Sequence, residues 1–146
     1  MPPSDPAAAA PALPPNWERH RQELLAGEVI HLWQIDLRAW TDAEPALHAL
    51  LSSAESERFA RLHRQEDRTR SIVARGVLRQ LLAASLATPA RPIFASLLAI
   101  QEGNGEKPYL AENPLHLDFN IAHSGDWALI ALLANGAVGV DVERMR

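Results

Sequence analysis

Leu117-Asp-Phe-Asn-Ile-Ala-His-Ser-Gly-Asp126 is the stretch that decides how the second half of this chain folds. Apolar and polar residues alternate along it as far as Ile121, which is the period of a strand with one buried face. The apolar run from Trp127 to Leu133 predicts a second strand, and Asn135-Gly136 predicts a two-residue hairpin after it. Alternation resumes over 138–143, so this region is predicted to consist of several strands.

Helices are predicted between an early strand and this region. The longest runs from about Glu66 to Leu86, because apolar residues recur there at helical spacing. Ser52-Ser-Ala-Glu55 has the spacing of a capping box and predicts a helix that continues to about His63. The other expected elements are a strand over Val29–Leu37, a short helix over Ala43–Leu51, a strand over Ile93–Ile100 and a loop over Gly103–Tyr109. This order predicts an α+β fold, in which an antiparallel sheet packs on a long central helix.

Arginines lie on two sides of the longest predicted helix. Arg70 shares a face with Val73 and Ala74, where a charge is costly unless it is paired. Its guanidinium suits a carboxylate or a phosphate, and the sequence supports an ion pair and a phosphate site equally. A second stripe consists of Arg64, Arg68, Arg75 and Arg79. Arg75 and Arg79 lie where the helix is otherwise apolar, so structural ion pairing is the first expectation for both.

The overall composition limits the classes of function. A chain of 146 residues with 47% hydrophobic and 22% charged residues suffices for one compact domain. Its net charge of −4 argues against binding to nucleic acid, and the lack of cysteine excludes disulfides and thiolate metal sites. No apolar run is long enough to span a membrane. Residues 1–16 form a Pro/Ala-rich tail expected to be disordered, so the ordered domain is expected over 17–146 of a cytoplasmic protein.

Three groups of polar residues suggest chemistry. Asp141 and Glu143 are two apart on a predicted strand, so both point away from the face that carries the valines. Such a pair suits a hard cation, with Mg²⁺ the natural choice, although charged pairs are also common on solvated sheet surfaces. His123 precedes a glycine at a strand end, where it either binds an anion or makes a structural hydrogen bond. Lys107 lies in a glycine-containing loop and is directed either to a phosphate or to solvent.

The order of these motifs resembles the first half of the larger, two-lobed 4′-phosphopantetheinyl transferases. These enzymes modify the carrier proteins of polyketide, nonribosomal peptide, siderophore and lysine pathways. The matching segments are His31–Leu37, Leu51–Arg58, Asp67–Arg70, Ala74–Arg79, Lys107–Leu110, Phe119–Gly125 and Val138–Glu143. The pair Phe-Asn-x-x-His-Ser-Gly and Gly-Val-Asp-x-Glu at this separation is the most specific part of the resemblance.

The resemblance implies an activity and a set of roles. The enzyme would transfer phosphopantetheine from coenzyme A to a serine of an acyl or peptidyl carrier protein and release 3′,5′-adenosine bisphosphate. Asp141 and Glu143 match the Mg²⁺ ligands that hold the pyrophosphate. Lys107 and His123 match residues that contact coenzyme A phosphates. Arg70 matches the helix arginine that contacts the 3′-phosphate, with Arg58 a second candidate for that phosphate.

Several departures from the family bear on activity. Glu106 stands where the family commonly has the glycine before the lysine, and Ala122 replaces a common serine. The family's second lobe carries a Trp-x-x-Lys-Glu-like helix, which supplies a further carboxylate and the expected catalytic base. That motif does not occur in these 146 residues, so the catalytic residue is unassigned. The alternatives are a transferase fragment, a non-catalytic coenzyme A-binding half-site, and a structural remnant that pairs with a second lobe or with another copy of the chain.

Overall fold

The computed structural model describes residues 13, 15–27, 29–102 and 106–143. The predicted disordered tail, apart from Leu13, Pro15 and Asn16, and the glycines of the 103–109 loop lie outside these residues. The chain divides into two compact units. The first contains Leu37–Leu97 with the residues up to Leu13, and the second contains Pro14–Asp36 and Leu98–Arg146. Among the described residues, no helix has the length and apolar character needed to cross a bilayer.

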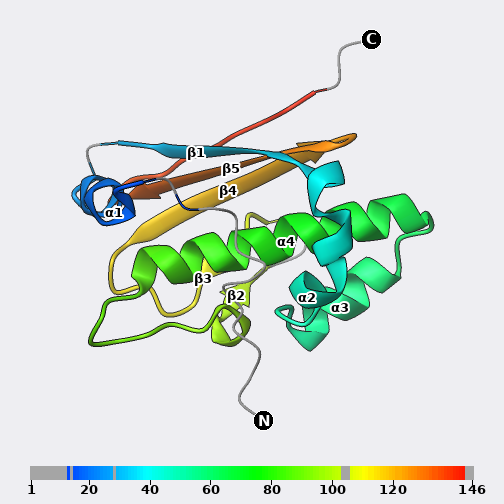
Figure 1. The fold of residues 1–146 in the computed structure, drawn as a ribbon, viewed down its shortest axis with the longest axis horizontal. Helices are drawn as coiled ribbons and strands as arrows, with labels where there is room; N and C mark the ends of the chain where they lie inside the picture. Colours follow the sequence, from blue (N-terminus) through cyan, green and yellow to red (C-terminus); the bar gives the residue numbers. More distant parts are fainter. Residues whose placement is uncertain (1–12, 14, 28, 103–105, 144–146) are drawn as a thin grey trace. The chain divides into compact units, whose positions relative to one another are not determined.

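The first unit is helical (Figure 1). Its elements are η2 (Leu37–Ala43), α2 (Glu44–His48), α3 (Ser53–Ala60), α4 (Gln65–Leu86) and η3 (Ala95–Leu97). The long helix therefore begins and ends close to the predicted Glu66 and Leu86. Gly76 allows α2 to approach α4 closely, because a Cβ at this position would lie 2.7 Å from the Cβ of Leu47.

The predicted capping box is present at the start of α3. The Ser52 side chain accepts a hydrogen bond from the Glu55 amide (3.2 Å), and the Ser52 amide donates to Glu55 Oε1 (2.8 Å). These bonds satisfy two of the amides that a helix start leaves without partners. The helix ends at Ala60 and not near His63, because Arg61 forms its C-cap and the chain then turns into α4.

Glu55 also ties α3 to α4 through a buried cluster of charges. Its Oε2 accepts from Arg75 (3.1 Å), and its Oε1 accepts from Arg79 Nε (2.8 Å) and pairs with Arg79 Nη2 (2.6 Å). Arg79 is fully buried and also donates to the Ala95 carbonyl at 2.9 Å, which fixes η3 beside α4. The expectation of structural ion pairing for Arg75 and Arg79 is confirmed. A carboxylate and two guanidiniums can be buried together here because each has a charged partner.

Arg70 is less buried than its helical face predicted. The side chain keeps 31% of its surface exposed and pairs with Asp67 at 3.6 Å, one turn earlier. Continuous burial of α4 begins only at Ser71. The ion pair that the sequence allowed for Arg70 is therefore present, whereas the burial implied by its helical face is only partial. Helical periodicity identifies a face but does not show how far along the helix other elements cover it.

The second unit contains a three-stranded antiparallel sheet in the order β1-β5-β4. Its strands are β1 (His31–Asp36), β4 (Leu117–Ser124) and β5 (Trp127–Ala134), and a separate ribbon pairs β2 (Ile100–Gln101) with β3 (Tyr109–Leu110). Together with the helical unit, this confirms the α+β class. The helix α1 (Trp17–Leu25) was not predicted from the sequence.

Two strand predictions were wrong. Only Ile100 of the predicted strand over Ile93–Ile100 enters a strand, while Ala95–Leu97 form a 3₁₀ turn and Phe94 and Leu97 are exposed. The segment 138–143 joins no sheet, and Asn135-Gly136 does not connect two strands. The two-residue hairpin of the sheet lies instead at Gly125-Asp126, between β4 and β5. Composition suited a strand in both segments, but a strand forms only where a neighbouring backbone is available to pair with it.

We predict that Glu55→Ala destabilises the first unit by about 3–5 kcal/mol, because the substitution leaves two buried guanidiniums without their carboxylate. Urea unfolding followed by circular dichroism measures this loss. Glu57→Ala is the matched control, since Glu57 is an exposed glutamate on the same helix and should change stability by no more than about 0.5 kcal/mol. Equal losses in the two variants would contradict a structural role for the buried cluster.

Aromatic rings and histidines join α1 to β1 in the second unit. The Trp17 ring lies 6.0 Å from His31 and 6.1 Å from Trp33, and His20 lies 6.1 Å from His31. Burial lowers the pKa of His31, and the positive charge of His20 lowers it further against an opposing effect of Glu23. The folded protein therefore binds the His31 proton less tightly than the unfolded chain does.

Stability should consequently depend on pH through His31. It should be highest above the unfolded pKa of about 6.5 and should fall as the pH drops through that value toward the lower folded pKa. His31→Phe retains a ring beside Trp17 but cannot titrate, so its urea midpoint should fall less between pH 8 and pH 5.5 than that of the parent protein. Exposed His63→Gln is the control and should follow the parent. A parent-like pH dependence in His31→Phe would contradict this assignment.

Candidate functional site

Lys107 and Asp118 anchor the segment that follows β5. Lys107 Nζ lies 2.6 Å from Asp118 Oδ2 and donates to the Val138 carbonyl at 2.6 Å. The same Asp118 oxygen accepts from the Val138 amide at 2.7 Å. Both backbone polar groups of Val138 are therefore bonded to side chains. These bonds explain why the segment is ordered without belonging to the sheet.

The carboxylates of the predicted metal site come directly after this anchor. Asn120 Oδ1 accepts from the Val140 amide at 2.8 Å. This contact lies two residues further along β4, and two residues further along the segment, than the contact between Asp118 and Val138. The segment therefore advances in the direction of β4, toward its His123 end, as Figure 1 shows for the stretch after β5. Asp141 and Glu143 are exposed, and one Asp141 oxygen accepts from the Val142 amide at 2.9 Å.

His123 lies near the end of β4, beside the hairpin. It is exposed and pairs in register with Ala128, and by strand alternation it lies on the face opposite Asp118 and Asn120. About 16 Å of strand separates His123 from Asp118, at about 3.3 Å per residue. The structure therefore places Lys107 and His123 at different ends of β4, with the two carboxylates on the segment that runs from one end toward the other.

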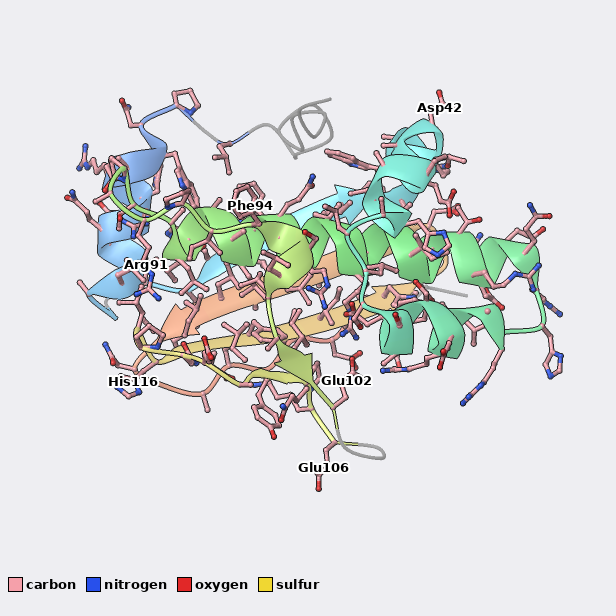
Figure 2. The ribbon with its side chains drawn as sticks, turned by 90° about the horizontal axis from the view of Figure 1, so that it is seen from below. Asp42, Arg91, Phe94, Glu102, Glu106 and His116 are labelled. Atoms are coloured by element: carbon pink, nitrogen blue, oxygen red, sulfur yellow. The ribbon has the colours of Figure 1, made fainter. Side chains whose placement is uncertain are left out.

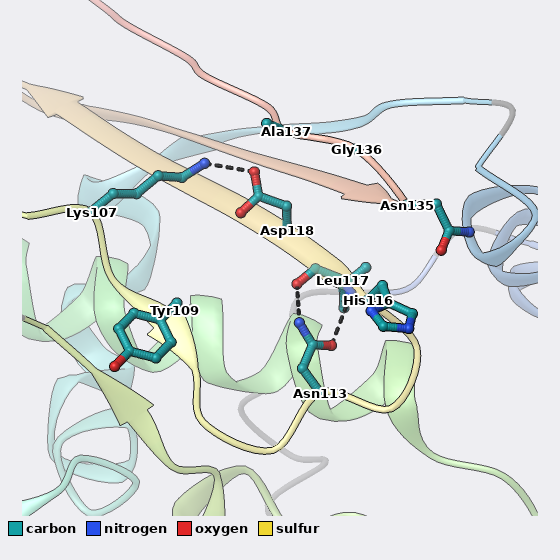
Figure 3. A pocket seen from close by; sticks show the side chains of 9 residues that line it. All are labelled: Lys107, Tyr109, Asn113, His116, Leu117, Asp118, Asn135, Gly136 and Ala137. Carbon is teal, nitrogen blue, oxygen red and sulfur yellow. Dashed lines mark hydrogen bonds and ion pairs between the residues drawn. The ribbon is translucent and has the colours of Figure 1, made fainter.

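A cavity of about 710 Å³ opens at the Lys107 end of β4 (Figure 3). Its lining includes Lys107, Asp118 and His116, and Asn113 bonds both backbone groups of Leu117 at its floor. Glu106 is exposed at the neighbouring loop, and its side chain points outward (Figure 2). The cavity thus offers one cation and several hydrogen-bonding groups.

The two predicted phosphate-binding arginines lie in the first unit. Arg58 is exposed on α3, and its guanidinium lies 5.6 Å from the centroid of the Phe59 ring. Arg70 lies on the first turns of α4 and pairs with Asp67 across one helical turn. The other four predicted site residues belong to the second unit, which holds Lys107, His123, Asp141 and Glu143.

The donor set of the carboxylate segment fits Mg²⁺ as a partial site. Within the described part of the chain, no group of three histidine, aspartate or glutamate side chains is arranged to hold a metal ion. Mg²⁺ commonly takes only one or two carboxylates and completes its octahedron with water and phosphate oxygens. Asp141 and Glu143 therefore suit a cation that arrives with a phosphate ligand.

Asp118 and Asn120 also belong to this arrangement, although neither was predicted as a site residue. The sequence contains a pattern that could have identified them, since both are short oxygen-bearing side chains on the polar face of an alternating strand. That pattern alone is also typical of a solvated face. Only the tertiary structure shows that a second backbone segment lies against them.

Comparison with known proteins connects this architecture to a family. Residues 32–134 match the family described as 4′-phosphopantetheinyl transferase, N-terminal. The chain is 37% identical over 102 residues to a putative 4′-phosphopantetheinyl transferase of Synechocystis sp., and this alignment covers 69% of this chain and 39% of that protein. It is 35% identical over 125 residues to the 4′-phosphopantetheinyl transferase HetI of Nostoc sp., and this alignment covers 84% of this chain and 50% of HetI. A phosphopantetheinyl transferase of Thraustochytrium sp. is 31% identical over 117 residues, with 77% of this chain and 39% of the relative covered.

The chain belongs to the 4′-phosphopantetheinyl transferase family. Its matched residues correspond to the N-terminal part of the family and cover β1 from Leu32 onward, Leu37–Leu97 of the first unit and both long strands of the hairpin. The chain spans half or less of the length of these three relatives. Asp141 and Glu143 follow the residues that the family match covers.

We predict that Gly125→Ala destabilises the protein by about 1–2 kcal/mol, because Gly125 has a φ of 58° and left-handed backbone is costly for residues with a Cβ. Gly139→Ala is the control, because open space surrounds a Cβ there and no positive φ is required. Thermal unfolding of the two variants measures the difference. A near-neutral Gly125→Ala would show that the hairpin is not held in the left-handed conformation.

Proposed function

We propose that this chain supplies the coenzyme A- and Mg²⁺-binding part of a 4′-phosphopantetheinyl transferase. The reaction moves 4′-phosphopantetheine from coenzyme A to a serine of an acyl or peptidyl carrier protein. The observation that carries the proposal is the exposed Asp141–Glu143 pair on an anchored segment, in a chain of this family. Coenzyme A and a carrier protein are accordingly the proposed partners.

The proposed roles follow from charge and position. Asp141 and Glu143 would hold Mg²⁺ against the pyrophosphate of coenzyme A, and the cation when bound would withdraw charge from the pyrophosphate oxygens. His123 and Arg70 would contact coenzyme A phosphates, with Arg58 a further candidate for the 3′-phosphate. Lys107 has three N–H donors, and its two observed acceptors use two of them. The third donor suits a phosphate oxygen without breaking the ion pair with Asp118.

These charges would serve the chemical step. The serine oxygen of the carrier forms a bond to the phosphorus that bears the pantetheine arm, and the bond from that phosphorus to the bridging oxygen breaks. The leaving 3′,5′-adenosine bisphosphate takes the electron pair, and a base accepts the serine proton. Cationic side chains fixed before the reaction stabilise charge that builds on the leaving group. The base remains unassigned among the described residues.

Calorimetry with coenzyme A tests the binding role in the 146-residue polypeptide. We expect binding that strengthens at least about tenfold when Mg²⁺ is added, because the carboxylates are close neighbours that a cation brings into contact with phosphate. Asp141→Asn with Glu143→Gln should remove this Mg²⁺ dependence. Glu112→Gln is the matched control, because Glu112 is an exposed carboxylate of the same unit outside the proposed site.

Intact-mass analysis of apo-carrier proteins tests transfer separately. We expect the 146-residue polypeptide to bind coenzyme A without modifying a carrier at a catalytic rate, because the proposed site has two carboxylates and no assigned base. Among the described residues, no third ligand joins Asp141 and Glu143 in a group that could hold a metal ion. Modification at a catalytic rate would contradict the expectation of an incomplete site. Absence of any coenzyme A binding, with or without Mg²⁺, would overturn the proposed function and favour a purely structural role.

A further inference from the structure

Side chains form the hydrogen bonds that hold the backbone of the segment 138–143, whereas in a β-strand the backbone of a neighbouring strand would form them. Asp118 and Asn120 accept from the amides of Val138 and Val140, and Lys107 donates to the Val138 carbonyl. Asp118 and Asn120 are two apart on β4, so both project from one face, at the spacing of alternate residues in an extended chain. The spacing of alternate residues in β4 therefore matches that in the segment, and each acceptor meets an amide that faces it.

This arrangement determines which way the carboxylates point. Val138 is buried and Val140 and Val142 are half-buried, whereas Gly139, Asp141 and Glu143 are exposed. An extended chain alternates its side chains, so fixing the amides of residues 138 and 140 toward β4 also fixes the orientation of residues 141 and 143. A slip of one residue would turn both carboxylates inward and the valines outward.

The Asn120 side chain is not required for the sheet itself. The Asn120 backbone pairs with Ala131 in the β4–β5 register, and that ladder does not involve the side chain. The side-chain oxygen instead makes its bond with Val140, one residue before Asp141. A change limited to this side chain therefore leaves the ladder intact and acts on the carboxylate segment.

We propose that Asn120 is a positioning residue that sets the register of the Asp141–Glu143 segment, with Asp118 and Lys107 anchoring the start of that segment. This inference rests on the proposed function only for the role of the carboxylates as Mg²⁺ ligands. The register itself is a property of the fold. Asn120 acts through the Val140 backbone and does not touch the metal or the substrate.

The test compares three variants of the 146-residue polypeptide. Asn120→Ala removes the acceptor, Asn120→Asp retains an acceptor oxygen, and Asn113→Ala removes two side-chain bonds to Leu117 on the same strand without touching the segment. Nuclear magnetic resonance measures amide hydrogen exchange at Val140. Electron paramagnetic resonance measures the affinity for Mn²⁺, used as the probe for the divalent-cation site.

We expect exchange at Val140 to accelerate roughly tenfold in Asn120→Ala, as the loss of one hydrogen bond implies. Mn²⁺ affinity should fall several-fold in this variant, while Asn120→Asp should keep Val140 protection within about threefold of the parent. Asn113→Ala should lower the melting temperature yet leave Val140 exchange and Mn²⁺ affinity within about twofold of the parent. This pattern of results would distinguish a change in the register of the 138–143 segment from a general loss of stability of the protein.

Unchanged Val140 exchange in Asn120→Ala, or an equal loss of Mn²⁺ affinity in Asn113→Ala, would overturn the proposal. If Asn120→Ala does not fold, Asn120→Asp decides, because an unprotected Val140 amide in a folded protein that retains the acceptor contradicts the assignment. A parent protein that binds no Mn²⁺ would refute the metal role of Asp141 and Glu143. The exchange measurement would still decide whether Asn120 sets the register.

Discussion

The buried Glu55 carboxylate is the interaction on which the helical unit depends. It closes the capping box of α3 and holds Arg75 and Arg79 of α4, while Arg79 also reaches the Ala95 carbonyl. Glu55 thus sets the start of α3 and its contact with α4, and Arg79, which it holds, bonds the 3₁₀ turn η3 at Ala95. Because a fully buried guanidinium such as that of Arg79 has no access to water, partners such as Glu55 and the Ala95 carbonyl must compensate its lost hydration.

The second unit applies a related principle at its surface. Asp118, Asn120 and Lys107 bond the backbone of the segment after β5, so side chains replace the ladder that another strand would provide. In a ladder the backbone of a neighbouring strand would bond the segment, whereas here side chains of β4 bond the Val138 and Val140 amides, and Gly139, Asp141 and Glu143 are exposed. Under the proposed function, this exposure would let the segment present Asp141 and Glu143 to Mg²⁺. The order in the proposed site would therefore depend on Asp118 and Asn120, which lie outside it, together with Lys107, which belongs to it.

Sequence patterns identified the elements whose information is local. The long helix, the capping box and the two strands of the hairpin were predicted close to their observed bounds, because periodicity and capping chemistry act within a few residues. Predictions failed where residues distant in the sequence decide whether a segment forms a strand or a side chain is buried. The segments 93–98 and 138–143 have strand-like composition, yet neither is part of a strand among the residues that the structure describes. The partial exposure of Arg70 depends on where other elements end.

By itself the sequence determined the α+β class, the family and the identity of the candidate site residues, since each depends on residue types in a fixed order. The charge pairing expected for Arg75 and Arg79 also followed, because an apolar helix face excludes unpaired guanidinium. Only the tertiary structure decided that Lys107 is paired with Asp118 and that Asn120 holds Val140. Those contacts join residues 11 and 20 positions apart, and no local pattern specifies which distant backbone will lie against a polar strand face.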